Sequence, residues 1–347
     1  MSDCLATELL RGGDWGADGP MISAFLSSPY FPLLEEALGR LQREALYRSR
    51  VHGAGHIERT LVHASMCAWA EGLSEADSRL LLTMCSYHDT GRICDYLDGA
   101  HGRRSAEKLA ALTGLTGEDL REAMAGVEAH SVSDGLMEGI LASHAPENLP
   151  RARMLAQMLK DADGLDRVRI DDLDVSYLRR APSRERGRFA QVLFDRYTAL
   201  EQARGLCGEA EGFDLPTIRR VKAMVRERIA AGDGCIETAL RCWDGLMGKS
   251  LADPCLDRVK ETGLCGLLAA AQAYFGALFA LQGLGEREIG ERCRAFSRRF
   301  REQYGSDRCS ELKPKSGCGG FTVDGILFAL QYLYQENEKK INGVGDS

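Results

Sequence analysis

A chain of 347 residues, 44% hydrophobic and 27% charged, is long enough for two folded domains and too apolar for a disordered protein. Its formal net charge of −7 argues against a protein that coats nucleic acid, so we expect a small-molecule substrate instead. The N-terminus has no basic segment before an apolar one and no stretch reaches 18 uninterrupted apolar residues, so we expect a cytoplasmic protein with no membrane partner.

Apolar residues recur at helical spacing along almost the whole chain. In chain order, this spacing predicts helices over residues 32–46, 56–73, 76–89, 105–114, 152–168, 188–203 and 215–230. The Ala-rich stretch 266–285 predicts a further helix, buried in a domain because glycines interrupt it. No stretch alternates as a strand would, so the expected fold class is all-α.

Histidine and cysteine are segregated along the chain. All seven histidines lie in the first 144 residues, whereas seven of the twelve cysteines lie in the last 117. Glycines within residues 230–235 follow the predicted helix 215–230 and are typical of a helix C-terminus. We therefore expect two helical domains, residues 1–231 and a smaller, cysteine-rich domain of residues 232–347. The sequence leaves the oligomeric state open.

Six histidines and aspartates stand out in the first domain, and all but His130 lie in or close to a predicted helix. Residues at the ends of packed helices can converge on one point of a bundle, however far apart they are in sequence. A mixed set of nitrogen and oxygen ligands suits divalent Fe, Mn, Zn, Ni or Co better than Ca or Mg. The six residues are His56, His88, Asp89, His101, His130 and Asp163.

Five short motifs surround these residues: "VHGAGHIERT", "YHDTGR", "HGRRSA", "AHS" and "KDADGLDR". On these motifs, residues 45–200 resemble the HD-domain metal-dependent phosphohydrolase superfamily, whose ordered signature is H…HD…D. The resemblance implies an HD-type helical bundle with one or two divalent ions. The first ion would be held by His56, His88, Asp89 and Asp163, with Asp161 as a competitor for the position of Asp163. The second ion would be held by His101 and His130, and Asp89 would bridge the two ions.

The same resemblance implies an enzyme that hydrolyses phosphate esters, as a phosphomonoesterase or a phosphodiesterase. Its substrate would be a nucleotide or another small phosphorylated metabolite, with Asp89 and Arg92 as catalytic residues. Arg92 could grip phosphate through its guanidinium fork, or it could be a solvated cation at a helix end. Two alternatives stay open: a di-iron HD-fold oxygenase with the same ligand order, and a nucleotide-binding signalling module regulated by thiols.

Three histidines lie outside this ligand set. We interpret His63 and His144 as helix-end or surface residues, since a lone histidine is more often such a residue than a ligand. His52 is close to His56 in sequence, and we interpret it as a contact to a ligand residue or to the substrate.

The cysteine-rich domain carries a second resemblance. The segments "GCIETALRC", "LCGLLAAA", "FREQYGSDRCSEL" and "SGCGG" resemble the redox-active protein family named for its C…GCAxxG…C…C pattern, over residues 232–340. The chain departs from that pattern at Leu264, Ala269 and Ala270. The resemblance implies a redox or second metal site, holding zinc or an iron–sulfur cluster or forming reversible disulfides. Its residues would be Cys235, Cys265, Cys309 and Cys318.

These four cysteines lie beside glycines or predicted helix starts, where backbone N–H groups can stabilise a thiolate. We therefore expect the four thiols to converge in space and to have lowered pKa values. The remaining cysteines of the domain are expected to be core residues, because free cysteine is among the most buried residue types. These are Cys242, Cys255 and Cys293.

Overall fold

The computed structural model describes residues 4–93, 95, 98–205, 213, 215–259, 264–312 and 319–341. Over these residues the chain forms helices and no strand, and the one β-type pairing is an isolated bridge between Leu264 and Arg308. The predicted all-α class is therefore confirmed. Every described helix is also too short or too polar to cross a membrane.

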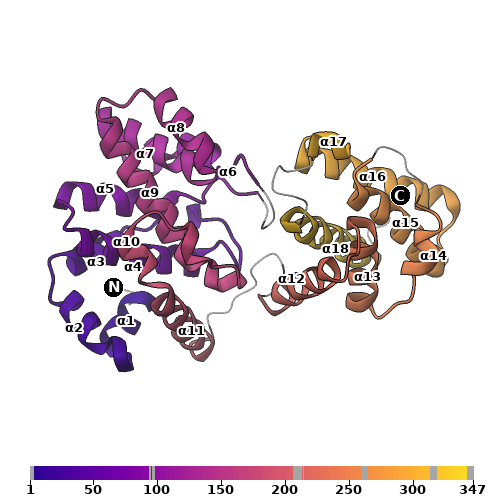
Figure 1. Ribbon diagram of the computed structural model, residues 1–347, viewed down its shortest axis with the longest axis horizontal. Coiled ribbons are helices and arrows are strands. Elements are labelled where there is room, and N and C mark those ends of the chain that lie inside the picture. The colour runs from indigo at the N-terminus through magenta and orange to yellow at the C-terminus, as the bar shows by residue number, and fades with distance from the viewer. Residues whose placement is uncertain are drawn as a thin grey trace. The chain divides into compact units, whose positions relative to one another are not determined.

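The first part of the chain contains eleven α-helices and four short 3-10 helices among the described residues (Figure 1). They are α1 (Leu5–Gly12), η1 (Gly16–Asp18), α2 (Gly19–Leu26), α3 (Tyr30–Gly39), η2 (Arg43–Ala45), α4 (Ala54–Glu71), α5 (Glu75–Tyr87), α6 (His101–Thr113), α7 (Gly117–His130), α8 (Asp134–Ser143), α9 (Leu149–Leu165), η3 (Asp166–Ile170), η4 (Val175–Tyr177), α10 (Ala181–Arg184) and α11 (Gly187–Ala203). The helix predicted over residues 32–46 is interrupted after Gly39, where α3 ends.

The second part contains seven α-helices among the described residues. They are α12 (Leu215–Ala230), α13 (Cys235–Met247), α14 (Ala252–Leu256), α15 (Gly266–Leu281), α16 (Glu286–Tyr304), α17 (Cys309–Leu312) and α18 (Gly319–Ile341).

The chain separates into two compact units, of which the first comprises residues 1–95 and 99–215 and the second contains residues 216–347. The boundary predicted between residues 231 and 232 thus falls earlier, and α12 belongs to the second unit. Packing is the reason: Ile218 and Val221 of α12 are buried. In addition, Arg220 donates a hydrogen bond of 3.1 Å to the carbonyl oxygen of Gly245 in α13. The glycines of residues 230–235 therefore form a turn inside one unit.

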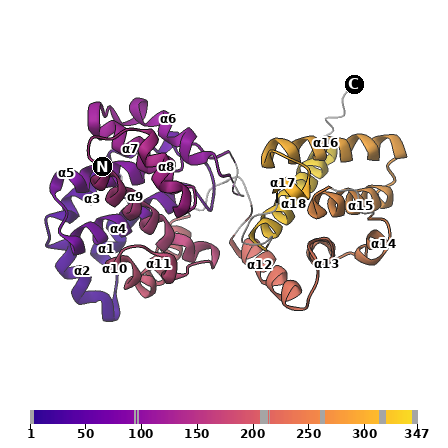
Figure 2. The ribbon, with the colours of Figure 1, turned by 45° about the horizontal axis from the view of Figure 1, so that its top comes forward.

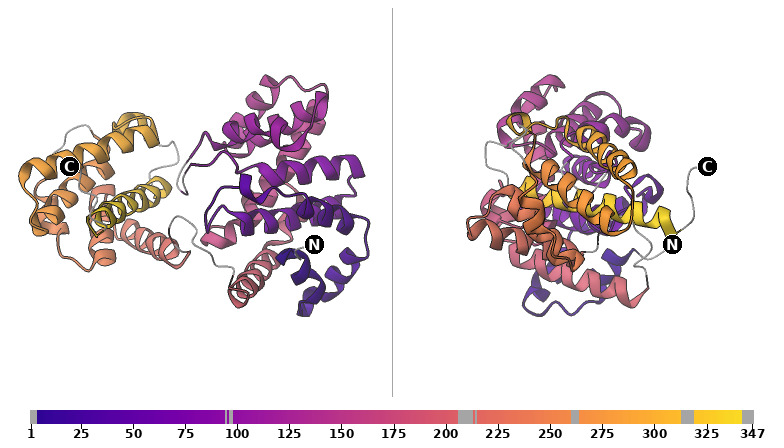
Figure 3. Two further views of the ribbon diagram at one scale, coloured as in Figure 1. Left: turned by 180° about the vertical axis from the view of Figure 1, so that it is seen from behind. Right: turned by 90° about the vertical axis from the view of Figure 1, so that its right-hand side faces the viewer.

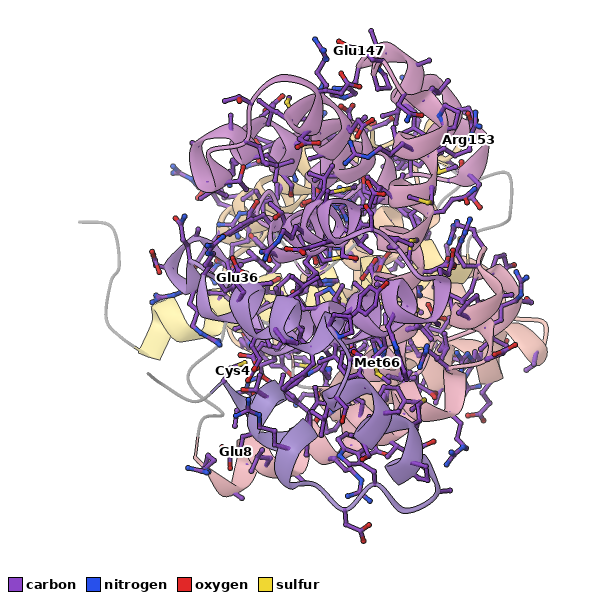
Figure 4. The ribbon with its side chains drawn as sticks, turned by 90° about the vertical axis from the view of Figure 1, so that its left-hand side faces the viewer. Cys4, Glu8, Glu36, Met66, Glu147 and Arg153 are labelled. Carbon is purple, nitrogen blue, oxygen red and sulfur yellow. The ribbon has the colours of Figure 1, made fainter. Side chains whose placement is uncertain are left out.

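Helix α4 is the central helix of the first unit, because its residues 56–68 are all buried. Helices α3, α5, α9 and α11 pack around it. A helix that is buried on every side belongs to the middle of a core, and Met66 of α4 is fully buried there. Figure 4 shows Met66 among the surrounding helices, whereas Glu147 and Arg153 lie at the edge of the unit.

Two glycines allow the turn after α5, α6 and α7 to approach one another closely. The backbone N–H of Gly91 donates to Ser105 Oγ at 2.8 Å. A Cβ atom at Gly91 would lie 2.4 Å from the backbone nitrogen of Ser105 and 2.5 Å from the carbonyl oxygen of His101. A Cβ atom at Gly102 would lie 2.5 Å from Ser131 Oγ. Any larger residue at either position would push α6 away from its neighbours.

The core of the second unit is aromatic. Phe275 of α15 stacks on Tyr332 of α18 with ring centroids 5.7 Å apart, and Phe296 of α16 meets Phe275 edge-on at 4.9 Å. Trp243 of α13 is fully buried and donates its indole N–H to the carbonyl oxygen of Ile326. Figure 2 shows α15 beside α16, and Figure 3 shows α13 beside α18.

Candidate metal centre

The six predicted ligands come from the ends of five helical segments and converge in the first unit. His56 lies in the first turn of α4, and the His88-Asp89 pair directly follows α5. His101 is the first residue of α6 and His130 the last of α7. Asp163 completes the set from the last turn of α9. The ends of sequence-distant helices therefore meet in one place, as the sequence predicts.

The histidines form two close pairs. His56 Nε2 lies 3.2 Å from His88 Nε2, and His101 Nε2 lies 2.9 Å from His130 Nε2. Asp89 stands between the pairs. Its Oδ2 atom is 3.6 Å from His56 Nε2 and 3.8 Å from His88 Nε2. Its Oδ1 atom is 3.2 Å from His101 Nε2 and 3.7 Å from His130 Nε2. One carboxylate oxygen thus faces each pair, which is the arrangement that a bridging ligand requires.

The partners of the Nδ1 atoms determine which nitrogen of each ring faces the centre. His88 Nδ1 lies 2.8 Å from the carbonyl oxygen of Cys85, and His130 Nδ1 lies 2.5 Å from that of Val127. His56 Nδ1 lies 2.8 Å from Asp166 Oδ2. Each partner only accepts hydrogen bonds, so each Nδ1 must carry the proton. In the neutral form of each of these three rings, Nε2 therefore presents a lone pair to the centre.

Burial and charge set the protonation states of the centre. Burial lowers the pKa of His88 to about 3 and also lowers the pKa of His130. For Asp89, burial by itself would raise the pKa, but Arg92 and then His88 hold it well below its usual range. Asp163 is affected in the same way, with His56 as the main group that opposes burial. Neutral imidazoles and ionised carboxylates are the forms that bind divalent cations.

The stretch 161–166 offers three aspartates, and each has a different role. Asp163 Oδ1 lies 3.3 Å from His56 Nε2 and 3.9 Å from His88 Nε2, so Asp163 faces the centre. Asp161, the competitor weighed from the sequence, faces away and accepts the backbone N–H groups of Arg179 and Arg180 at 2.9 and 2.7 Å. The third, Asp166, contacts Nδ1 of His56, the ring nitrogen that does not face the centre.

Two further residues contact Asp89. Arg92 Nε lies 2.9 Å from Asp89 Oδ1 and only 12% of its side chain is exposed, so Arg92 is not a solvated cation at a helix end. His52 Nδ1 lies 3.0 Å from Asp89 Oδ2, in agreement with the interpretation of His52 as a contact to a ligand residue. Arg169, which sequence reasoning missed, donates from Nε to the carbonyl oxygen of Val51 and lies 3.2 Å from His52.

The interpretation of His63 as a helix-end or surface residue is wrong. His63 is fully buried in α4, and neither ring nitrogen has a hydrogen-bond partner among the described residues. The helical periodicity was compatible with a solvent-facing position, but α4 is surrounded on every side. His144 is half-buried and lies 2.8 Å from Glu128 Oε2, outside the centre.

A cavity of about 530 Å³ adjoins the centre, since His130 and Asp163 are among its lining residues. Lys160, Arg167 and Arg179 also line it. Asp172 and Asp174 line it as well, and each of the three cations is paired with an aspartate. Its volume is in the range of small-molecule sites. A second cavity, of about 570 Å³ beside α3 and α5, is lined by none of the six predicted ligands.

Three of the four predicted cysteines meet in the second unit. Cys235, Cys265 and Cys309 line one cavity of about 20 Å³. The backbone N–H of Cys265 donates to the carbonyl oxygen of Asp307 at 2.7 Å, which joins the segments that carry Cys265 and Cys309. A Cβ atom at Gly266 would lie 2.5 Å from Cys235 Sγ, so only glycine allows this approach. The fourth, Cys318, lies outside the described residues.

The expectation of lowered thiol pKa values fails at Cys265. Burial raises the pKa of this thiol, and hydrogen bonds from the start of α15 only partly oppose the effect of burial. Cys242 and Cys255 are fully buried, as expected for core residues, whereas Cys293 is half-buried.

No family model, curated protein or solved structure matches the chain.

Proposed function

We propose that the first unit is a metal-dependent phosphohydrolase that acts on a nucleotide or another small phosphorylated metabolite. The observation that carries the proposal is the pair of histidine clusters on either side of Asp89, with lone pairs of three imidazoles directed inward. In their Nδ1-protonated tautomers, His56 and His88 direct lone pairs toward each other across 3.2 Å, and a cation bound beside both nitrogens would relieve their repulsion.

The donor set fits divalent transition metals. His56 and His88 each offer an imidazole nitrogen that lies within 4 Å of carboxylate oxygens of both Asp89 and Asp163. His101 and His130 offer a second pair of nitrogens within 4 Å of Asp89 Oδ1. Imidazole and carboxylate donors suit Fe, Mn, Zn, Ni or Co. Such ions supply Lewis acidity toward a phosphoryl oxygen and lower the pKa of an attacking water.

The chain's own residues would bind and orient the substrate. The guanidinium of Arg92, which contacts Asp89, would offset negative charge that develops on a phosphoryl group. Lys160, Arg167 and Arg179 line the adjoining cavity and would hold further anionic groups of the substrate. The burial of His88 and Asp89 excludes bulk water, which strengthens these electrostatic interactions.

The test is metal analysis of anaerobically purified protein, followed by phosphate release from a panel of phosphorylated metabolites. We expect His88→Ala and Asp89→Ala to lose both bound metal and phosphate release. His144→Gln is the matched control, because His144 is a histidine of the same unit outside the centre.

Full activity of either alanine variant would contradict the site assignment. Phosphate release should proceed without O₂ consumption and should be supported by redox-inert metals. Strict dependence on iron and O₂ would replace the hydrolase with the oxygenase alternative.

For the second unit, we propose a metal or redox site formed by Cys235, Cys265 and Cys309, because these three side chains line one cavity. About 20 Å³ is room for a single water-sized occupant, which favours one zinc ion over an iron–sulfur cluster. Zinc content of the full chain should fall when Cys265 is replaced by Ser and stay unchanged for the buried Cys255→Ser control. Equal zinc content in both variants, together with thiols that form no reversible disulfide, would identify the cavity as a packing feature.

A further inference from the structure

We infer that Asp166 is a positioning residue that holds His56 with Nε2 toward the metal centre and strengthens metal binding at the group formed by His56, His88, Asp89 and Asp163. This inference rests on the proposed function of the same centre. Asp166 does not face the centre itself, because its carboxylate lies on the opposite side of the His56 ring.

The contacts of Asp166 account for this assignment. Its Oδ2 atom lies 2.8 Å from His56 Nδ1, and its side chain is fully buried. Arg59 binds it in a bidentate manner, with Nε at 2.6 Å from Oδ1 and the terminal nitrogen at 2.9 Å from Oδ2. A buried carboxylate that accepts two bonds from a guanidinium and one from an imidazole is held in a single orientation.

Arg59 is itself held on two sides. Its guanidinium carbon lies 5.1 Å from the ring centroid of Phe194 and 5.0 Å from that of Tyr197, both on α11. Arg59 also lies three residues after His56 on α4, on the same side of the helix. His56 and Arg59, the residue that orients the carboxylate partner of His56, therefore belong to the same buried helix.

His56 differs in this respect from two of the other histidines. The Nδ1 atoms of His88 and His130 face neutral carbonyl oxygens of their own helices. Only for His56, among these three, is the partner a carboxylate. A carboxylate on Nδ1–H fixes the tautomer and makes Nε2 a stronger electron donor, which favours binding of a cation. The carboxylate of Asp166 is therefore expected to strengthen metal binding through His56.

Asp161 provides a matched control. It lies on the same stretch of chain and is equally buried, but its partners are the backbone and guanidinium groups of Arg179 and the backbone N–H of Arg180. Asp161→Asn and Asp166→Asn thus make the same chemical change at the same depth. Only Asp166→Asn alters a group that touches a histidine.

The experiment compares the full chain with these two variants, freed of metal and titrated with Co²⁺ and Zn²⁺. We expect Asp166→Asn to weaken metal binding at the group that contains His56 by about 10- to 100-fold. Asp161→Asn should stay within about threefold of the unmodified chain, even where it lowers thermal stability. Arg59→Lys keeps the positive charge but loses the bidentate contact, so its effect should lie between the two.

A second measurement needs neither metal nor substrate. Nitrogen NMR of the metal-free chain should show His56 protonated at Nδ1, and Asp166→Asn should give a mixture of both tautomers. Unchanged metal affinity or an unchanged His56 tautomer in Asp166→Asn would overturn the inference. If Asp166→Asn fails to fold, the same outcomes are scored on Arg59→Lys.

These readouts separate the inference from the proposed function. A chain that binds metal and loses affinity in Asp166→Asn, yet releases no phosphate from any ester, supports the inference and contradicts the function. A chain that hydrolyses phosphate esters with equal metal affinity in both asparagine variants supports the function and contradicts the inference.

Discussion

The buried His63 makes the stability of the first unit dependent on pH. Both of its ring nitrogens lack hydrogen-bond partners among the described residues, and its side chain is fully buried. Burial lowers its pKa to about 3; Asp166 partly opposes this effect, whereas Arg59, Arg186 and His56 add to it. His63 is therefore neutral in the folded chain at pH values well above 3.

The sign and size of the effect follow from linkage. The unfolded chain takes up a proton at this residue near pH 6.5, whereas the folded chain does so only near pH 3. The contribution of His63 to stability is thus fully present above pH 6.5 and is lost as the pH falls from 6.5 toward 3. At pH 5.0 the pH lies about 1.5 units below the pKa of histidine in the unfolded chain. Proton binding to the unfolded state therefore lowers the unfolding free energy by about 2 kcal/mol between pH 7.5 and pH 5.0.

The substitution His63→Leu removes this titration. Urea unfolding of the metal-free chain at pH 7.5 and pH 5.0 measures the difference, in a Trp243→Phe background. Trp15 and Trp69 then report on the first unit alone, because they are the remaining two of three tryptophans. Between the two pH values, the chain with His63 should lose about 2 kcal/mol more unfolding free energy than His63→Leu. The other histidines are common to both chains, so their contributions cancel.

His63→Leu should also be the more stable protein at pH 7.5, because it removes a buried polar group that has no partner. Equal losses of free energy in the two chains on acidification would refute the reasoning. That result would mean that the folded chain admits a proton or a hydrogen-bond partner at His63.

Three further predictions concern other parts of the molecule. Gly91→Ala should lower the unfolding free energy by roughly 1–3 kcal/mol and weaken metal binding, since its Cβ atom would collide with the backbone of α6; wild-type thermal unfolding and metal affinity would contradict this. Saturating the chain with metal at 100 times the dissociation constant should stabilise the first unit by about 2.7 kcal/mol, and a chelator should reverse the change in calorimetry; no shift would mean that the centre binds no ion. In the metal-free, folded chain, the exposed Cys309 should react with a thiol reagent well before Cys242, where burial raises the pKa to about 11, and mass mapping that finds Cys242 labelled first would refute this order.

The helical class and the six converging histidines and aspartates could be predicted from the sequence, although Asp161 was left as a competitor of Asp163. Apolar spacing reports on local backbone geometry, because residues three and four apart share a face of a helix whatever that face contacts. The same local information placed His56, His88 and His101 at or near helix ends, and the described helices begin or end beside each of them. No helix was predicted around His130, which the structure shows to be the last residue of α7. The Gly266 step beside Cys265 was likewise visible as a motif, although its reason, the approach of Cys235, was not.

The direction in which each side chain points could not be predicted from the sequence. Asp161, Asp163 and Asp166 are indistinguishable by residue type, and they are separated by their partners: backbone N–H groups, the histidine pairs, and Arg59. Local spacing also could not show that α4 is surrounded on every side and buries His63. The position of Asp89 between two histidine pairs likewise depends on the packing of five helical segments at once. Such packing is set by contacts between residues far apart in sequence, which no local pattern contains.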